Sequence, residues 1–144
     1  MVNVLVPMDG SPPSWTALDH AASIVDDGTI TVLHVVDPMS IMYSGDEEGY
    51  YDPGSYERAR ERGEDLLEEV REHLVSEGVL ESTEFRDVIE VGRPSTTIVE
   101  YVEDHNVDHV VMGSHGRTGV SRLLLGSVAE TVVRRIPVPV TIIR

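Results

Sequence analysis

Five short apolar runs alternate with helical segments along this chain, and that alternation limits the possible folds more than any other feature. Runs of this kind, rich in β-branched residues, are typical of strands buried on both faces of a sheet. The pattern predicts one α/β domain over residues 1–144, with a single doubly wound, mostly parallel five-stranded sheet and helices on both faces. We expect the strands at residues 2–7, 29–36, 82–91, 107–112 and 138–143.

Helix signals lie between these strands. Ser11 is a good N-cap with Pro12 at the first helical position, and a charged amphipathic helix is expected over residues 55–76. The last helix is expected over residues 127–135. Residues 37–54 form a long polar connection that holds three tyrosines, which either cover a ligand or pack at an interface.

Charge is the second constraint. The net charge is −15, which argues against nucleic acid as a partner, and all 11 basic residues are arginine. An acidic, lysine-free surface resembles that of proteins from salt-loving organisms, where salt screens self-repulsion. Residues 1–112 carry 25 acidic and six basic side chains, net −19, whereas residues 113–144 carry five arginines and one glutamate, net +4. Two of those arginines, Arg117 and Arg122, fall in a glycine-bearing loop where an anion could sit.

Several classes are excluded or disfavoured by absences in the sequence. The chain has no cysteine, so disulfides and thiolate metal sites are excluded. No apolar run approaches the roughly 18 residues of a membrane helix, and we see no signal peptide, so we expect a cytoplasmic protein without membrane contact. A Walker A loop is excluded because it requires a lysine and the chain has none. A standard dinucleotide-binding fold is disfavoured because no G-x-G-x-x-G motif follows the first strand.

The segment from Gly113 to Ser127 holds the most informative motif. It leaves a predicted strand, passes through glycines and enters a predicted helix, where Ser127 and Glu130 have the spacing of a capping box. Glycines allow close backbone approach, and a helix N-terminus adds unpaired N–H groups and a favourable dipole. The segment is therefore predicted to bind a phosphate chain, although glycines also occur in ordinary turns and Ser127 could be only a cap.

The spacing Gly113, two residues, Gly116, nine residues, Gly126-Ser127 resembles the ATP-binding branch of the universal stress protein family. The resemblance covers nearly the whole chain and implies a Rossmann-like fold of the adenine nucleotide alpha hydrolase type. It implies that ATP binds with Mg²⁺ or Mn²⁺ bridging the phosphates, and no metal ligand from the protein is expected. The other segments that resemble the family are residues 4–11, 33–36, 92–94 and 138–140. The residues that the resemblance assigns to the nucleotide are Asp9, Val35, Met112, Gly113, Gly116, Arg117, Gly126 and Ser127.

Several candidate site residues have an alternative role in the local structure. Asp9 either caps the turn before Ser11 or contacts the ligand, and Arg117 either pairs with phosphate or is an ordinary surface arginine. His34 lies in an apolar strand and is interpreted as a core histidine with a hydrogen-bond partner, whereas His115 lies inside the loop and is a site candidate. No base–nucleophile pair for efficient hydrolysis is evident.

The resulting hypothesis is an ATP-binding stress-response protein that acts as a binding protein or slow switch, without a catalytic residue. A nucleotide-free interaction module, a slow ATP hydrolase and, from topology alone, a flavin carrier stay open as alternatives. Pro137 and Pro139 beside the last strand indicate a sheet edge. Family members often pair this strand across a two-fold axis, so the resemblance implies a homodimer through residues 138–143.

Overall fold

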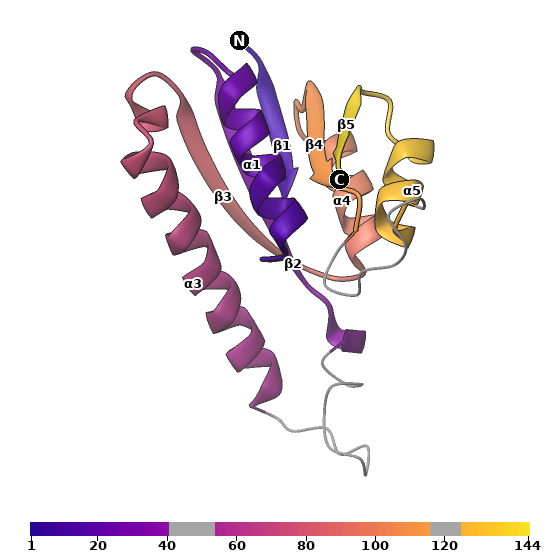
Figure 1. Ribbon diagram of the computed structural model, residues 1–144. Helices are drawn as coiled ribbons and strands as arrows, with labels where there is room; N and C mark the ends of the chain where they lie inside the picture. Colours follow the sequence, from indigo (N-terminus) through magenta and orange to yellow (C-terminus); the bar gives the residue numbers. More distant parts are fainter. Residues whose placement is uncertain (41–53, 116–124) are drawn as a thin grey trace.

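The computed structural model describes residues 1–40, 54–115 and 125–144. Its sheet has five strands in the order β3-β2-β1-β4-β5, and every adjacent pair is parallel (Figure 1). The predicted doubly wound fold is thereby confirmed. The strands are β1 (Asn3–Pro7), β2 (Thr29–Val36), β3 (Glu84–Val91), β4 (His109–Gly113) and β5 (Val140–Ile143). The helices are α1 (Pro12–Ile24), α3 (Ser55–Ser76), the short 3₁₀ helix η1 (Val79–Glu81), α4 (Pro94–Asp104) and α5 (Ser127–Arg135).

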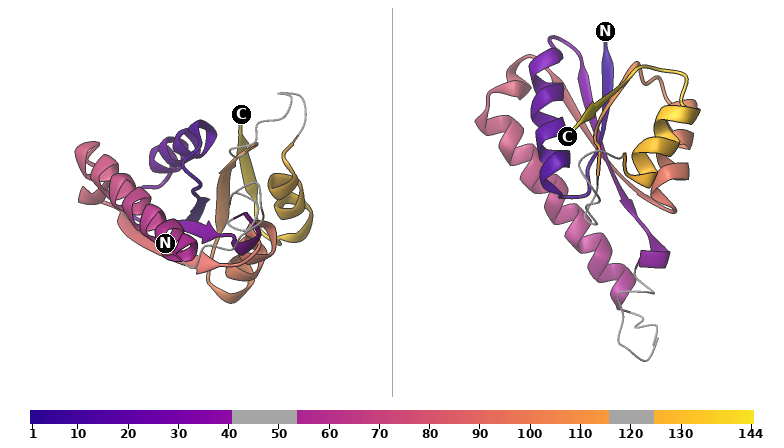
Figure 2. Two further views of the ribbon diagram at one scale, coloured as in Figure 1. Left: turned by 90° about the horizontal axis from the view of Figure 1, so that it is seen from below. Right: turned by 45° about the vertical axis from the view of Figure 1, so that its right-hand side comes forward.

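α1 and α3 cover one face of the sheet, and α4 and α5 cover the other (Figures 1 and 2). Successive strand residues point to opposite faces, so Val4 and Val32 pack in the cluster under α1 and α3. Their neighbours Leu5 and Leu33 pack in the cluster under α4 and α5. Because both faces of these strands are buried, both sets of alternating side chains are apolar, and the strands form continuous apolar runs in the sequence.

Both edges of the sheet differ from the sequence expectation in detail. β5 is an edge strand as predicted, but it starts at Val140 rather than Val138, because Pro139 has no N–H to give the ladder and contributes only its carbonyl to Val110 N at 3.0 Å. β3 forms the opposite edge and is largely exposed. The turn η1 before it was not predicted. It follows Gly78, whose φ of 74° ends α3 in the left-handed region that glycine tolerates.

The helix starts show one confirmed boundary and one wrong cap. Ser11 is the N-cap of α1 as predicted, although its hydroxyl donates to Asp9 and accepts no hydrogen bond from the first turn of the helix. The capping box predicted from Ser127 to Glu130 is wrong, because Gly126 is the N-cap of α5 and Ser127 is already its first helical residue. Glu130 instead forms an i,i+4 ion pair with Arg134 at 2.8 Å.

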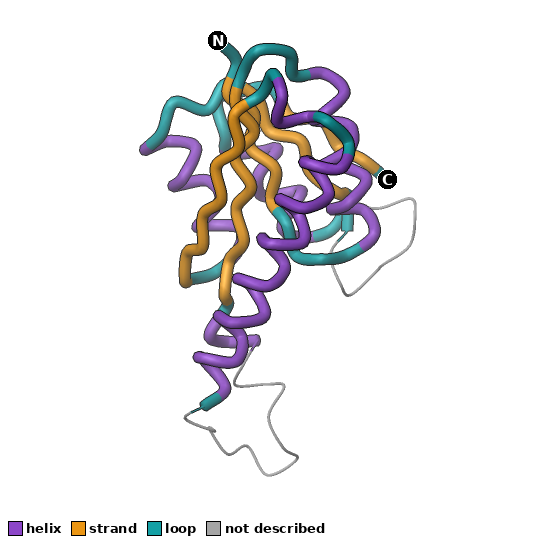
Figure 3. The backbone as a smooth tube through the Cα atoms, turned by 90° about the vertical axis from the view of Figure 1, so that its left-hand side faces the viewer, coloured by secondary structure: helices purple, strands orange, loops and turns teal. Residues whose placement is uncertain are grey.

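α3 is long enough to extend past the carboxyl ends of the neighbouring strands, so its first turns form a wall beyond the sheet (Figures 1 and 3). Its buried positions, Gly63, Leu67, Val70 and Leu74, recur at helical spacing on the side that faces the sheet. Among the described residues, no helix has the length and hydropathy of a membrane span.

Candidate functional site

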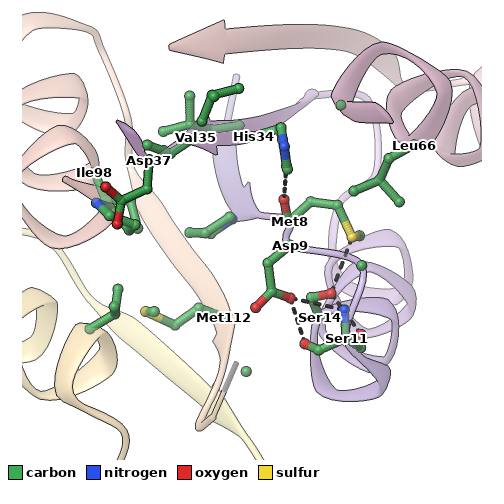
Figure 4. Close-up of a pocket in the computed structure, with 18 of the residues that line it drawn as sticks. Met8, Asp9, Ser11, Ser14, His34, Val35, Asp37, Leu66, Ile98 and Met112 are labelled. Atoms are coloured by element: carbon green, nitrogen blue, oxygen red, sulfur yellow. Dashed lines mark hydrogen bonds between the residues drawn. The ribbon is translucent and has the colours of Figure 1, made fainter. Parts of the chain in front are cut away.

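A cavity of about 930 Å³ lies at the carboxyl ends of β1, β2 and β4. In a doubly wound sheet, ligands bind at this end, at the point where the strand order reverses, which here lies between β1 and β4. The first turn of α5, the N-terminal half of α3 and the start of α4 complete the walls (Figure 4). The position is the one that the sequence predicted, although the contribution of α3 was not foreseen.

The β4–α5 junction brings an open helix N-terminus to this cavity. The amide of Gly126 donates to Ser114 O at 2.7 Å, which holds the start of α5 against the end of β4. The first hydrogen bond of α5 runs from Glu130 N to Gly126 O at 2.9 Å. The amides of residues 127–129 precede that bond, and all three residues line the cavity. They are N–H groups of the kind that binds anions at a helix N-terminus, where the dipole adds to the attraction.

The structure supplies a packing reason for two of the motif's glycines. A Cβ at Gly113 would lie 2.7 Å from Pro13 Cβ, and one at Gly126 would lie 2.9 Å from Ser114 O. Both glycines are therefore required by the close approach of the chain to itself, whatever the cavity holds. Gly116 and Arg117 lie outside the described residues.

Val35 presents backbone groups to the cavity because of the register of β2. Thr29 N donates to Val2 O and Met8 N donates to Leu33 O, so the odd-numbered residues of β2 turn their backbone toward β1. β1 ends at Pro7, opposite Leu33. The N–H and C=O of Val35 therefore point past the end of β1. Val35 itself lines the cavity, so these two backbone groups face it. A donor and an acceptor side by side match the edge of a purine that carries a ring nitrogen beside an amino group.

Apolar side chains form the wall beside Val35. Ile98 from α4 and Met112 from β4 are 2 % and 5 % exposed, and both line the cavity (Figure 4). Both belong to one core cluster, and the partly buried Val35 and Val128 pack against it. Pockets for heterocyclic ligands are typically apolar with a few placed polar groups, so this half of the cavity suits a flat base.

Asp9 lines the cavity and also organises the turn after β1. Its Oδ1 accepts hydrogen bonds from Ser11 N at 2.9 Å and from Ser11 Oγ at 2.5 Å (Figure 4). The predicted turn-capping role is thus confirmed. The two roles are compatible, because a carboxylate has acceptor sites on both oxygens.

His34 has a partner, as predicted, but it lies at the cavity wall rather than deep in the core. Its Nδ1 is 2.8 Å from Met8 O, and its ring faces Gly63 of α3, where a Cβ would lie 2.5 Å from His34 Cδ2. Gly63 was not predicted as a site residue. A glycine inside a helix costs about 1 kcal/mol relative to alanine, and that cost was the available signal.

Ser114 and His115 follow β4 directly. Ser114 Oγ lies 3.0 Å from His115 Nδ1, and His115 Nε2 is buried and has no hydrogen-bond partner among the residues that the structure describes. His115 lines the cavity, as expected of a residue in this loop.

The described part of the cavity wall is acidic. Its charged side chains are Asp9, Asp37, Asp65 and Glu69, with Arg62 as the cation among the described residues. No cluster of three metal-ligating side chains occurs in the described segments. A polyphosphate beside these carboxylates requires a cation to offset the repulsion, and Mg²⁺ suits such a site because it keeps several waters and binds mainly to phosphates.

The family model for the universal stress protein family matches residues 1–144. Universal stress protein MJ0531 of Methanocaldococcus jannaschii is 35% identical over 143 residues, which is 98% of this chain and 81% of that protein.

Solved structures of universal stress proteins are also similar to this chain. The structure of protein MJ0577 of Methanocaldococcus jannaschii aligns with a TM-score of 0.81 at 31% identity and covers 99% of this chain and 94% of that one. A universal stress family protein from Arabidopsis thaliana with AMP bound aligns with a TM-score of 0.67 at 19% identity, covering 99% and 91% of the two chains. A universal stress protein in complex with cAMP aligns with a TM-score of 0.66 at 24% identity, covering 99% and 96%. The last two share the fold.

Proposed function

Because this chain belongs to the universal stress protein family, we propose that it binds ATP with a divalent cation and acts as a stress-response binding protein or slow switch. One observation carries the proposal. The same cavity receives the outward-facing backbone of Val35 and the open first turn of α5. A ligand with a purine base at one end and phosphates at the other would satisfy both. Homologous structures with AMP or cAMP bound support an adenine nucleotide.

The base would lie against Met112 and Ile98, with its polar edge on Val35. The N–H of Val35 would donate to N1 of adenine, and its C=O would accept from the 6-amino group. Hypoxanthine carries a hydrogen on N1 and a carbonyl at position 6, so it would oppose both backbone groups. Asp9, at the turn between the base and the phosphates, would accept a hydrogen bond from the ribose.

The phosphates would lie at the β4–α5 junction. The amides of residues 127–129 would donate to them, beside Gly113 and Gly126. By the family resemblance, Gly116 and Arg117 would contact them from the loop. Mg²⁺ or Mn²⁺ would bridge the phosphates and offset the carboxylates of the wall.

The test is a calorimetric titration of the purified protein with Mg-ATP and Mg-ITP. We expect ATP to bind at least about tenfold more tightly than ITP, because ITP leaves two backbone groups unpaired. Equal affinities would refute the base site. Mass analysis of nucleotide that co-purifies with the protein would identify the natural ligand.

We also propose a homodimer through the edge strand β5, within the predicted segment 138–143. β5 pairs with β4 along one side, and its four residues are half-buried in the single chain. An apolar edge of this kind favours pairing with a second copy. Sedimentation at high salt should give the mass of a dimer, and a monomer at all concentrations would refute the proposal.

Slow ATP hydrolysis is the second candidate, favoured by His115 Nε2, which lies at the cavity and has no hydrogen-bond partner in the described part of the chain. Steady-state ADP release would support it if His115→Ala abolished the release while nucleotide binding persisted.

A further inference from the structure

We propose that His34 is a positioning residue that keeps the N–H of Val35 open for the nucleotide base. The inference rests on the proposed adenine site and adds a device that controls it. The device is the hydrogen bond between His34 Nδ1 and Met8 O, at 2.8 Å (Figure 4).

The register of the sheet identifies what this hydrogen bond replaces. Thr29 N donates to Val2 O, and every second residue of β2 continues the pattern toward β1. The next rung beyond Leu33 would run from Val35 N to Met8 O. His34 Nδ1 donates to Met8 O instead, so the hydrogen-bond ladder between β1 and β2 ends one rung early.

Two further contacts and its burial hold Met8 in place. Met8 N donates to Leu33 O at 2.9 Å, and Ser14 Oγ lies 3.2 Å from Met8 Sδ. Met8 is 2 % exposed.

The ring of His34 is fixed from its other side by Gly63. A Cβ there would lie 2.5 Å from His34 Cδ2 and 3.0 Å from His34 Nε2. A carbonyl oxygen only accepts hydrogen bonds, so the proton lies on Nδ1. The bare backbone of α3 therefore leaves room for the one ring orientation that points Nδ1 at Met8.

The first experiment measures hydrogen exchange at the Val35 amide without nucleotide. In His34→Leu the donor to Met8 O is gone, so Val35 N should close the next rung and its exchange should slow by about tenfold or more. His34→Asn keeps an amide nitrogen at the position of Nδ1 and should behave as the wild type. His34→Gln is the matched control, because its amide nitrogen lies at the position of Nε2, and it should behave as His34→Leu. Gly63→Ala, which displaces the ring with His34 still present, should slow exchange in the same way.

The second experiment uses Mg-ATP and its 1-deaza analogue, which lacks the N1 acceptor. In His34→Leu, ATP should bind about tenfold more weakly while the affinity for the analogue stays unchanged. In His34→Asn both affinities should match the wild type. A loss of general fold integrity would weaken both ligands equally.

Unchanged Val35 exchange in His34→Leu and Gly63→Ala would overturn the proposal, as would equal weakening of ATP and its analogue. If the wild type bound neither ligand, the proposed adenine site would fail. The exchange comparison would still decide whether His34 holds the amide open.

Discussion

Replacing Ser127 with proline should remove one phosphate-binding amide and leave α5 intact. Ser127 is the first helical residue, a position that tolerates proline because its N–H has no partner within the helix. The preceding Gly126 has φ −65° and ψ 158°, an extended conformation compatible with a following proline. The substitution therefore deletes a donor without straining the backbone.

The magnitude follows from the charge of the acceptor. A hydrogen bond to a charged group contributes about 1.5–3 kcal/mol, so Ser127→Pro should bind Mg-ATP about 10- to 150-fold more weakly. Adenosine has no phosphate and should keep its affinity. Ser127→Ala keeps the amide and loses the hydroxyl, so it distinguishes the contribution of the amide from that of the hydroxyl.

Calorimetry with ATP and adenosine measures both affinities, and thermal unfolding of each variant checks the fold. Unchanged ATP affinity in Ser127→Pro would refute the assignment of this amide. Equal weakening of ATP and adenosine would show instead that the variant had disturbed the whole cavity.

Three further predictions concern stability. Burial raises the pKa of the Tyr101 hydroxyl above its ordinary 10.0, with Glu90 adding to the shift and Arg86 opposing it. The fold therefore favours neutral Tyr101 and should lose that stability as the pH rises above about 10; urea unfolding at pH 8 to 11 should show a smaller loss in Tyr101→Phe. Leu18 is fully buried, so Leu18→Ala should lower the free energy of unfolding by about 2–5 kcal/mol, and a loss below 1 kcal/mol would contradict the packing described. With a net charge of −15, the protein should gain thermal stability as KCl is raised, and a flat response would refute the role of self-repulsion.

The sequence predicted the layers and the edge position of the last strand because those features depend on short-range patterns. Strands buried on both faces are continuously apolar. Pro137 and Pro139 have no N–H to donate to a strand on each side, so the strand beside them must lie at an edge. The range predicted for the last helix, residues 127–135, matches α5, but its N-cap was placed one residue late, at Ser127, because the Ser127–Glu130 spacing satisfies a local rule. The N-cap position of Gly126 depends on its contact with Ser114, which the local pattern does not contain.

Features of the site that depend on register or on distant packing were not predictable in this way. The direction of Val35's backbone follows from which residues of β1 and β2 pair. Gly63 has no room for a Cβ because the His34 ring of β2 lies against it, and Gly113 has none because Pro13 of α1 does. The motif located the cavity, but only the tertiary contacts distinguish its glycines from those of an ordinary turn.

The central claim is that one nucleotide reaches both Val35 and the first turn of α5. An amide NMR titration of ¹⁵N-labelled protein tests it most directly. Mg-ATP should shift the amides of Val35 and of residues 127–129 together, with one affinity, whereas adenosine should shift Val35 alone. Shifts confined to other surfaces, or no shift at either position, would contradict the account.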